Sequence, residues 1–281
     1  MSYPWSTVAC VTTPPYENPD LAGAYEDGNK MPEESLRAWV ELIGGFSPRL
    51  PADVVEIGSG TGMLCEALVR HGRAARVLGV EPSAEMRPQA KALHSHPLVE
   101  YVEGSAESVP AKDGDFDLAL LSRVVHHLPD RPACARELAR ILRSDGVVVI
   151  RTTFRERLDA DVYSYWPQAL EADLCRFPRR DEVVADFATA GFRVRAETSL
   201  SLPVARSLGE YRDRLATRPQ SKLAQLSDEE FQAGLRRLTD AADAAEAAEA
   251  SNASDLAGSA GSAVSERYDV LVLAKTGDMS A

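Results

Sequence analysis

The sequence predicts an α/β protein in which a parallel sheet is covered by helices. From residue 53 onward, strand-like and helix-like segments alternate, a glycine-rich turn joins the first strand to its helix, and a further apolar strand lies at 268–274. Such alternation is typical of parallel strands joined by crossover helices. The expected strands are near 53–58, 76–81, 99–103, 116–121 and 146–152, with helices near 62–71, 84–94 and 132–143.

The individual elements follow from local composition. Val54, Val55 and Ile57 are apolar and β-branched, as in a strand that is buried on both faces. Pro132 suits the first turn of a helix, and Leu138 belongs to the apolar face of that helix. These patterns support the parallel sheet with helices on both faces.

The second half of the chain continues the pattern and then departs from it. A helix is expected at about 160–176, and another around Phe187 is ended by Gly191 before a strand at about 192–199. About sixty residues separate this strand from the last one, although connections of about 4 to 6 residues are usual. An insertion of this length predicts a lid over a binding site.

We expect one domain that spans the whole chain, 1–281. Residues 1–32 read as an arm, 33–200 and 264–276 as the core, and 201–263 as a helical lid with its linker. Ser227 and Glu230 form a capping-box pair that begins a lid helix, and the alanine-rich run 241–250 continues it. The small polar residues of 251–263 are typical of a flexible return linker.

Composition narrows the classes of partner that the protein is expected to bind. The 281 residues carry a formal net charge of -12, so the average field of the protein repels a phosphate backbone. The four cysteines lack C-x-x-C spacing, which is typical of a reduced, cytoplasmic protein. The sequence shows neither a signal peptide nor an apolar run of the roughly 20 residues that a membrane span needs. We therefore expect a cytoplasmic protein that binds neither nucleic acid nor membrane.

The turn between the first strand and helix has the glycine spacing G-x-G-x-G, from Gly58 to Gly62. Glycines permit positive φ and let a ligand approach the backbone N–H groups at the start of a helix. A dinucleotide fingerprint has G-x-G-x-x-G spacing, and its third glycine is replaced here by Met63. Glu56, inside the strand, needs a partner such as an ammonium group. The turn therefore predicts a nucleotide-like ligand.

Acidic residues follow the next two strands. Glu81 ends the second strand, where a carboxylate accepts hydrogen bonds from both ribose hydroxyls in several nucleotide-binding folds. The alternative for Glu81 is a helix-capping or solvent-facing acid. The segment 103–107 follows the third strand. An acid there, such as Glu107, is expected to meet an adenine amino group. The alternative is that it is an ordinary loop residue.

The fourth strand is followed by four polar residues. Because the carboxyl ends of parallel strands border the ligand crevice, Ser122, Arg123, His126 and His127 are expected to approach the reacting region.

Five segments, in this order and spacing, resemble the class I S-adenosylmethionine-dependent methyltransferases, especially the small-molecule group similar to the quinone C-methyltransferases. The segments are VVEIGSGTG, GVEPS, EGSAESVP, DFDLALLSRVVHHL and GVVVIRT. The resemblance spans roughly residues 36–200, with a closing strand near 267–275. It implies a Rossmann-like sheet of seven strands whose last strand is antiparallel and lies beside the fifth.

The resemblance also implies S-adenosyl-L-methionine as cofactor and assigns expected roles. The expected set is Glu56, Gly58, Ser59, Gly60 and Gly62 around the methionine part, Glu81 at the ribose, Pro82, Ser83 and Met86 beside the adenosine, Ser105, Ala106 and Glu107 at the adenine, and Ser122 and Arg123 near the amino acid or sulfonium end.

The main task expected of the enzyme is to align a nucleophile for methyl transfer in a site that excludes water, so a general base is optional. His126 and His127 are the candidate bases, because histidine titrates near neutral pH. Their alternative role is to cap the helix after the fourth strand. His94 and His96 lie away from other candidate ligands, and we expect no metal site.

Four aromatic residues are candidates for acceptor binding: Tyr16, Tyr25, Trp166 and Tyr211. Their faces suit a flat or isoprenoid molecule, and ordinary packing is the alternative for each. A functional role is favoured for Tyr16 and Tyr25, since the arm has no obvious apolar core in which they could pack.

The predicted function is methyl transfer to a small organic acceptor, at a carbon of an electron-rich aromatic or prenylated secondary metabolite. N- or O-methylation uses the same scaffold and stays open, as does the oligomeric state. Two alternatives of other classes are an NAD-dependent oxidoreductase and a non-catalytic S-adenosylmethionine-binding protein.

Overall fold

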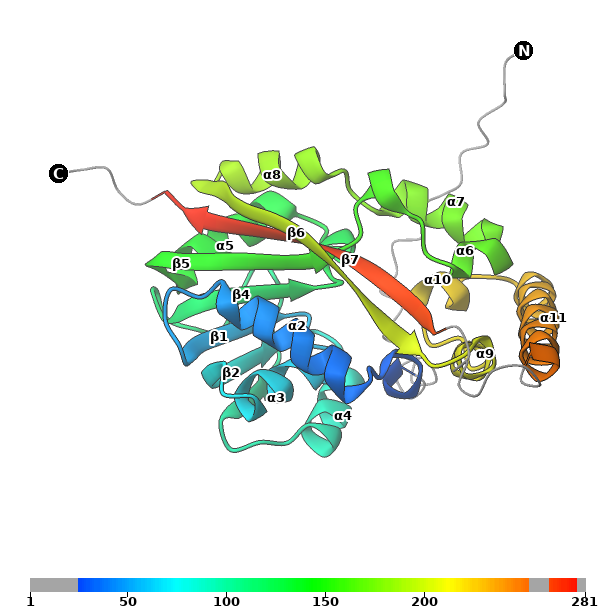
Figure 1. The fold of residues 1–281 in the computed structure, drawn as a ribbon. Helices are drawn as coiled ribbons and strands as arrows, with labels where there is room; N and C mark the ends of the chain where they lie inside the picture. Colours follow the sequence, from blue (N-terminus) through cyan, green and yellow to red (C-terminus); the bar gives the residue numbers. More distant parts are fainter. Residues whose placement is uncertain (1–24, 253–262, 277–281) are drawn as a thin grey trace, which may run out of the picture.

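A computed structural model describes residues 25–252 and 263–276 of the chain. Its sheet has seven strands in the order β3-β2-β1-β4-β5-β7-β6 (Figure 1). The strands are β1 (Ala52–Ile57), β2 (Ala74–Val80), β3 (Val99–Val102), β4 (Phe116–Ser122), β5 (Leu142–Thr152), β6 (Phe192–Ala205) and β7 (Val264–Lys275). β7 pairs antiparallel with β5 and β6, whereas the pairs among β1 to β5 are parallel. The expected seven-stranded sheet with an antiparallel last strand beside the fifth is confirmed.

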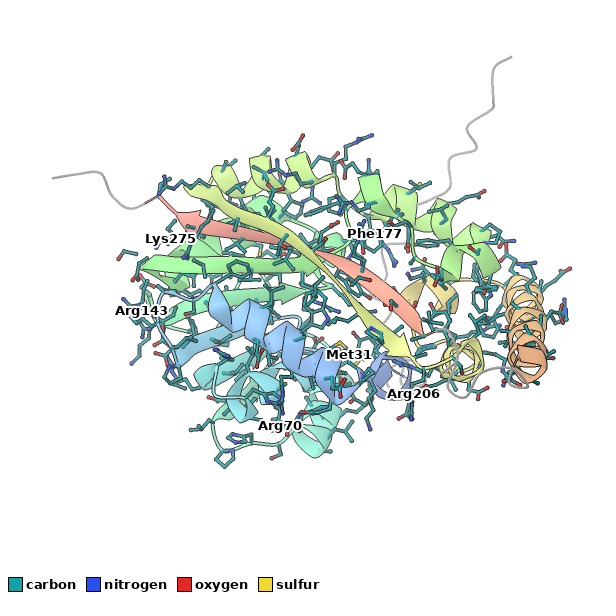
Figure 2. All side chains as sticks on the ribbon, in the orientation of Figure 1. Met31, Arg70, Arg143, Phe177, Arg206 and Lys275 are labelled. Carbon is teal, nitrogen blue, oxygen red and sulfur yellow. The ribbon has the colours of Figure 1, made fainter. Side chains whose placement is uncertain are left out.

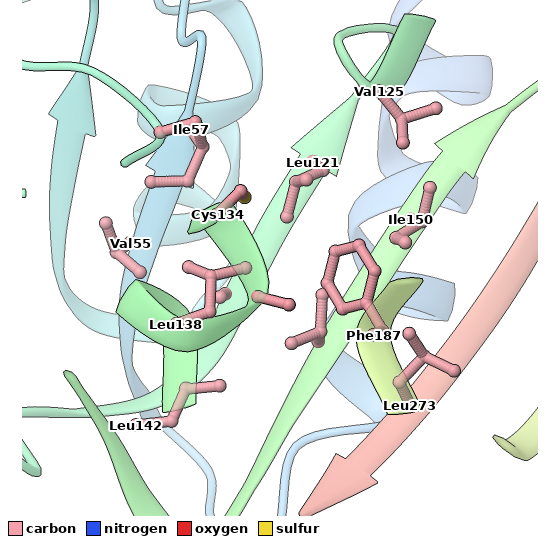
Figure 3. Close-up of a cluster of buried hydrophobic side chains, with 14 of the residues drawn as sticks. Val55, Ile57, Leu121, Val125, Cys134, Leu138, Leu142, Ile150, Phe187 and Leu273 are labelled. Atoms are coloured by element: carbon pink, nitrogen blue, oxygen red, sulfur yellow. The ribbon is translucent and has the colours of Figure 1, made fainter. Parts of the chain in front are cut away.

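Helices cover both faces of this sheet because successive strand residues point to opposite sides. Val55 and Ile57 pack in one apolar cluster with α5 (Arg131–Ile141) and α8 (Arg180–Ala188), shown in Figure 3. Val54, on the other side of β1, packs in a second cluster. That cluster includes residues of α2 (Glu33–Gly45), α3 (Met63–Arg70) and α4 (Met86–Leu93).

Five further helices lie beyond the carboxyl ends of the parallel strands (Figure 1) and are called the lid below, which adds two helices before residue 201 to the expected lid segment 201–263. They are α6 (Val162–Tyr165), α7 (Pro167–Arg176), α9 (Leu208–Leu215), α10 (Ser221–Ala224) and α11 (Asp228–Asn252). A third apolar cluster holds them together and includes Trp166, Leu215 and Phe231. Two short 3-10 helices, η2 (Val125–His127) and η3 (Arg155–Arg157), follow β4 and β5. Within the described ranges, no helix is both long and apolar enough to cross a bilayer.

Some boundaries differ from the expected ones. The single helix expected at about 160–176 is two helices, since Trp166 leaves the helical conformation (φ -127°, ψ 76°) before Pro167 begins α7. β6 and β7 continue pairing as far as Ala205 and Val264, and residues 25–29 of the expected arm are helical.

The expected capping box is present, and two other expectations concern residues that the structure does not describe. The Ser227 hydroxyl accepts the Glu230 N–H at 3.3 Å, and the Glu230 carboxylate accepts the Ser227 N–H at 2.9 Å, which confirms the capping box. Tyr16 and the linker residues 253–262 lie outside the described residues.

Candidate active site

A cavity of about 850 Å³ lies between the carboxyl ends of the strands and the lid. One part of its wall comes from the loops after β1, β2 and β3, which contribute Gly58, Glu81 and Ala106. Another part comes from the lid, through Arg176 and Lys222. The sheet order places β2 and β3 on one side of β1 and places β5 and β7 on the other. The cavity therefore has one end at the glycine turn and the β2 and β3 loops, and another end at the lid.

The turn after β1 requires glycine at specific positions. Gly58, Gly60 and Gly62 have φ of 67°, 56° and 86°. A Cβ on Gly58 would come within 2.6 Å of Val124, and one on Gly62 would come within 2.2 Å of the Tyr101 hydroxyl. Side chains are excluded by both conformation and space. Gly58 and Gly60 line the cavity, whereas Gly62 is the N-cap of α3.

The Glu81 carboxylate ties the turn to the loop after β2. One oxygen accepts the Gly60 N–H and the other accepts the Ser83 N–H, both at 2.9 Å. Burial raises the pKa of Glu81. Each carboxylate oxygen has two acceptor sites, so each keeps one for a ligand after these bonds. Glu81 lines the cavity and can accept a pair of hydroxyl groups there.

Glu56 is a buried carboxylate on the α3 side of β1. It accepts a hydrogen bond from the Cys65 thiol at 3.0 Å, and no ion pair within the described residues includes it. Burial raises the pKa of Glu56 to about 7. Glu56 lines an adjoining cavity of about 70 Å³, which shares Gly58 and Ser122 with the large cavity. This position suits a cationic ligand group such as an ammonium.

Other expected cofactor residues are brought together around the same space. Pro82, Ser83, Met86, Ser105, Ala106 and Glu107 line the large cavity, and Ser59 lines the small one. The Ser59 hydroxyl, one Glu107 carboxylate oxygen and the Arg151 Nε are buried with no hydrogen-bond partner among the described residues. Buried polar atoms in such a position fit a polar ligand that supplies their partners. The residues present therefore fit S-adenosylmethionine.

The end of β4 brings Ser122 and Arg123 to both cavities. Arg123 has a positive φ of 59°, and its guanidinium donates to the Asn29 side-chain oxygen at 2.7 Å. The guanidinium carbon also lies 6.0 Å from the centre of the Tyr25 ring. The helical turn at residues 25–29 is thereby joined to β4, and it carries Tyr25 to the cavity wall.

His126 and His127 lie next to each other on η2 and line the cavity. The His126 ring stacks on Phe177, which follows α7 (Figure 2), with ring centres 4.0 Å apart. Burial, together with Arg176 and Arg123, lowers the pKa of His127 to about 3. Burial lowers the pKa of His126 as well, with the same cations contributing. Both imidazoles are therefore neutral at neutral pH.

The lid contributes residues that sequence patterns do not single out. Arg176 is the last residue of α7 and Lys222 lies in α10, forty-six positions further along the chain. Both contact Asp173, a fully buried carboxylate of α7. Charged residues in amphipathic helices usually face solvent, so no local pattern marks these two as cavity residues.

The aromatic candidates have different positions. Tyr25 lines both cavities, and the buried Tyr211 lines the small one, with its hydroxyl 3.5 Å from Glu266. Trp166 is fully buried in the lid, where it stacks on Phe231 and its indole N–H donates to the Phe231 carbonyl at 3.0 Å. A packing role accounts for Trp166, in place of the expected acceptor contact.

No group of three or more metal-ligating side chains is arranged to hold a metal ion in the parts of the chain that the structure describes. His94 has another role, because its ring lies between two carboxylates. Its Nδ1 is 2.8 Å from Glu66 and its Nε2 is 3.0 Å from Glu26.

Comparison with known proteins finds methyltransferases. Residues 55–150 match the model of a methyltransferase domain. The chain is 25% identical over 181 residues to a ubiquinone/menaquinone biosynthesis C-methyltransferase from Campylobacter jejuni, covering 54% of this chain and 74% of that protein. It is 36% identical over 126 residues to a ubiquinone biosynthesis O-methyltransferase from Bradyrhizobium diazoefficiens, covering 44% of this chain and 46% of that protein.

A solved structure shares the fold over most of both chains. It is a putative methyltransferase from an antibiotic biosynthesis pathway of Anabaena variabilis. The TM-score is 0.67 at 24% identity, with 87% of this chain and 99% of that chain covered.

Proposed function

We propose that this chain, a class I S-adenosylmethionine-dependent methyltransferase that acts on a small molecule, methylates a carbon of an electron-rich aromatic or prenylated metabolite. The observation that carries the proposal is the position of two neutral, weakly basic histidines on the wall of a cavity whose other end fits the cofactor. A volume of about 850 Å³ suits the cofactor together with a small acceptor. Nucleic acid is not proposed as a partner.

The proposed cofactor contacts follow from the geometry of the first two strands. Glu56 takes the ammonium group, because it is a buried carboxylate outside any ion pair of the described residues. The turn from Gly58 to Gly62, with Ser59, surrounds the methionine part. Glu81 accepts the ribose hydroxyls through the acceptor sites that Gly60 and Ser83 leave.

The remaining contacts lie along the same wall. Pro82, Ser83 and Met86 border the adenosine, Ser105, Ala106 and Glu107 border the adenine, and Ser122 and Arg123 lie near the amino acid or sulfonium end. The bound cofactor supplies an electrophilic methyl group on a sulfonium. The lid and the turn at residues 25–29 exclude water and align the acceptor with that group.

The basicity of the histidines favours carbon as the methylated atom. A phenol-like hydroxyl has a pKa of about 10, so an imidazole whose pKa is about 3 is a poor base for it. A ring carbon that has gained a methyl group is cationic and strongly acidic, and a weak base suffices to remove its proton. In this proposal His127 takes that proton, and His126 holds the ring of His127 in place by contact at 4.1 Å between ring centres.

The proposal is tested with S-adenosylmethionine that carries a ¹³C-labelled methyl group. The purified chain is incubated with extracted small metabolites, and products are analysed by mass spectrometry and ¹³C NMR. We expect a gain of one CH₂ with equimolar S-adenosylhomocysteine, and a methyl shift typical of a carbon-bound methyl. A shift typical of O-methyl or N-methyl would contradict the carbon assignment, and cofactor binding without any methylated product would contradict methyl transfer.

Replacing His127 tests its part in the reaction. We expect His127→Ala to lower kcat about 100-fold, the lower end of the range typical of general-base contributions, with the affinity for S-adenosylhomocysteine unchanged. Steady-state kinetics and calorimetry check the two parts of this expectation. His96→Ala is the control, since the His96 ring contacts the local Leu98 N–H. An equal loss in both variants would remove His127 from the mechanism.

A further inference from the structure

The lid end of the cavity contains two cations that share one carboxylate. Arg176 lies 2.5 Å and Lys222 lies 3.8 Å from the fully buried Asp173, which also accepts a hydrogen bond from the Tyr163 hydroxyl at 2.8 Å. Arg176, Lys222 and Tyr163 line the cavity. One carboxylate balances one of the two cations, so this cluster carries an excess positive charge.

The neighbouring charges do not remove this excess. Glu266 interacts with Lys222, Arg123 and Arg151, and its carboxylate accepts the Tyr268 hydroxyl at 2.6 Å. Glu56 is the other carboxylate close to Arg151. Glu266 is therefore shared among Lys222, Arg123 and Arg151 and does not neutralise all three cations. The sulfonium of the cofactor adds a further positive charge.

The two cations and an unpaired donor face the cavity. Arg176, Arg123 and Lys222 all act to lower the pKa of His126, after burial as the largest cause. Arg176 Nε is a buried donor with no hydrogen-bond partner among the described residues. A buried cation and an unused donor on a cavity wall are stabilised by an anionic acceptor of hydrogen bonds.

We propose that the methyl acceptor carries one carboxylate, which binds between Arg176 and Lys222 while the apolar part of the acceptor extends past Phe177 towards the histidines. The inference rests on the proposed methyl transfer to a small molecule. A single carboxylate balances the one cation that Asp173 leaves uncompensated between Arg176 and Lys222. Phe177 and Tyr163 supply aromatic surface beside the two cations, with Lys222 Nζ 4.8 Å from the centre of the Tyr163 ring.

The test uses three ligands with the same ring system and different charge. Calorimetry of the full chain with saturating S-adenosylhomocysteine compares 1-naphthoate, 1-naphthamide and 1-naphthyl phosphate. We expect 1-naphthoate to bind about tenfold or more tightly than the neutral amide, because charge-assisted hydrogen bonds are stronger than those between neutral groups. Equal binding of acid and amide, tighter binding of the phosphate, or no binding of any of the three overturns the proposal.

Two variants remove only the excess charge. Lys222→Met leaves Asp173 paired with Arg176, and Arg176→Gln leaves it paired with Lys222, so either variant keeps one cation for the buried carboxylate. We expect each to reduce the affinity for 1-naphthoate about tenfold and to leave that for 1-naphthamide unchanged. Two variants give a second measurement if one of them fails to fold, and S-adenosylhomocysteine binding reports the folded site.

Lys91→Met is the matched control, because Lys91 is an exposed residue of α4. It should bind all three ligands as the unmodified chain does. A loss of 1-naphthoate affinity in Lys91→Met equal to that in Lys222→Met would contradict the site. The labelled-methyl assay separates the two proposals. Charge-dependent naphthoate binding without any methylated metabolite would reject the proposed function alone, and methylated products without a naphthoate preference would reject the carboxylate alone.

Discussion

The two ends of the cavity differ in charge and in how the chain builds them. The end at β1 and β2 combines a glycine turn with the buried carboxylates Glu56 and Glu81, which are twenty-five positions apart in the sequence. The lid end combines Arg176 and Lys222, which belong to separate helices. An acidic end suits the ammonium and hydroxyl groups of the proposed donor, and a cationic end suits an anionic acceptor. Two histidines illustrate a similar contrast: burial acts to lower the pKa of His94, which lines neither cavity, but Glu26 and Glu66 raise it, whereas burial and nearby cations lower the pKa of His127.

The largest effect is expected at the acidic end, from Glu81→Ala. The carboxylate is proposed to hold the ribose, and it also fixes the turn through the Gly60 and Ser83 N–H groups. Losing two hydrogen bonds to a charged group costs about 3 kcal/mol or more, so the affinity for S-adenosylhomocysteine should fall about 100-fold. Calorimetry measures this affinity. Glu103→Ala is the control, because Glu103 follows β3 but is exposed and pairs with Arg87. Unchanged affinity in Glu81→Ala would contradict the proposed cofactor site.

A smaller, pH-dependent effect is expected at Glu56. Its pKa of about 7 in the free protein means that it binds a proton below neutral pH, whereas a bound ammonium favours the ionised form. Affinity for S-adenosylhomocysteine should therefore rise about tenfold from pH 6 to pH 8. Glu56→Gln should bind weakly and lose most of this pH dependence, while the exposed control Glu85→Gln should keep it. If Glu56→Gln kept the same pH dependence of affinity, that dependence would have to come from the titration of another group.

In the protein without cofactor, Glu56→Gln should have the opposite effect and stabilise the fold. Because the folded-state pKa of Glu56 lies above the ordinary value of 4.5, its contribution to stability is full below that value and is lost as pH rises through about 7. Glu56→Gln should therefore raise the free energy of unfolding at pH 8 by roughly 1 to 3 kcal/mol. Chemical denaturation without cofactor measures this.

The acidic end was predictable from sequence because its parts are local. β-branched residues fix β1, positive φ requires the glycines, and Glu81 follows from the end of the next strand. Each of these features depends on residues close together in the chain. The late strand at 268–274 is β7, and it lies beside β5 as the family resemblance implies.

The lid end was not predictable because long-range packing decides it. Arg176 and Lys222 meet only through Asp173, and nothing within either helix signals that contact. Trp166 illustrates the same limit: its sequence context suggested a pocket residue, yet Phe231, sixty-five positions away, provides the partner that buries it. The expected single helix at 160–176 missed the break at Trp166, although Pro167 supplied a local signal for it.

The smallest effect is expected where the acidic end holds the helical turn at residues 25–29. His94 bridges Glu66 and Glu26, and Glu26 accepts a hydrogen bond from the Thr61 hydroxyl of the glycine turn at 2.6 Å. Since the folded-state pKa of His94 is raised above 6.5, the stabilisation by this bridge is full below that pH and is lost as pH rises through the raised value. His94→Gln should therefore lower the free energy of unfolding by about 1 kcal/mol at pH 6 and by less at pH 9. Denaturant titrations at both pH values check this, with His96→Gln as the control. A loss that does not depend on pH would show that His94 acts by packing, and the contrast between its environment and that of His127 would then not rest on charge.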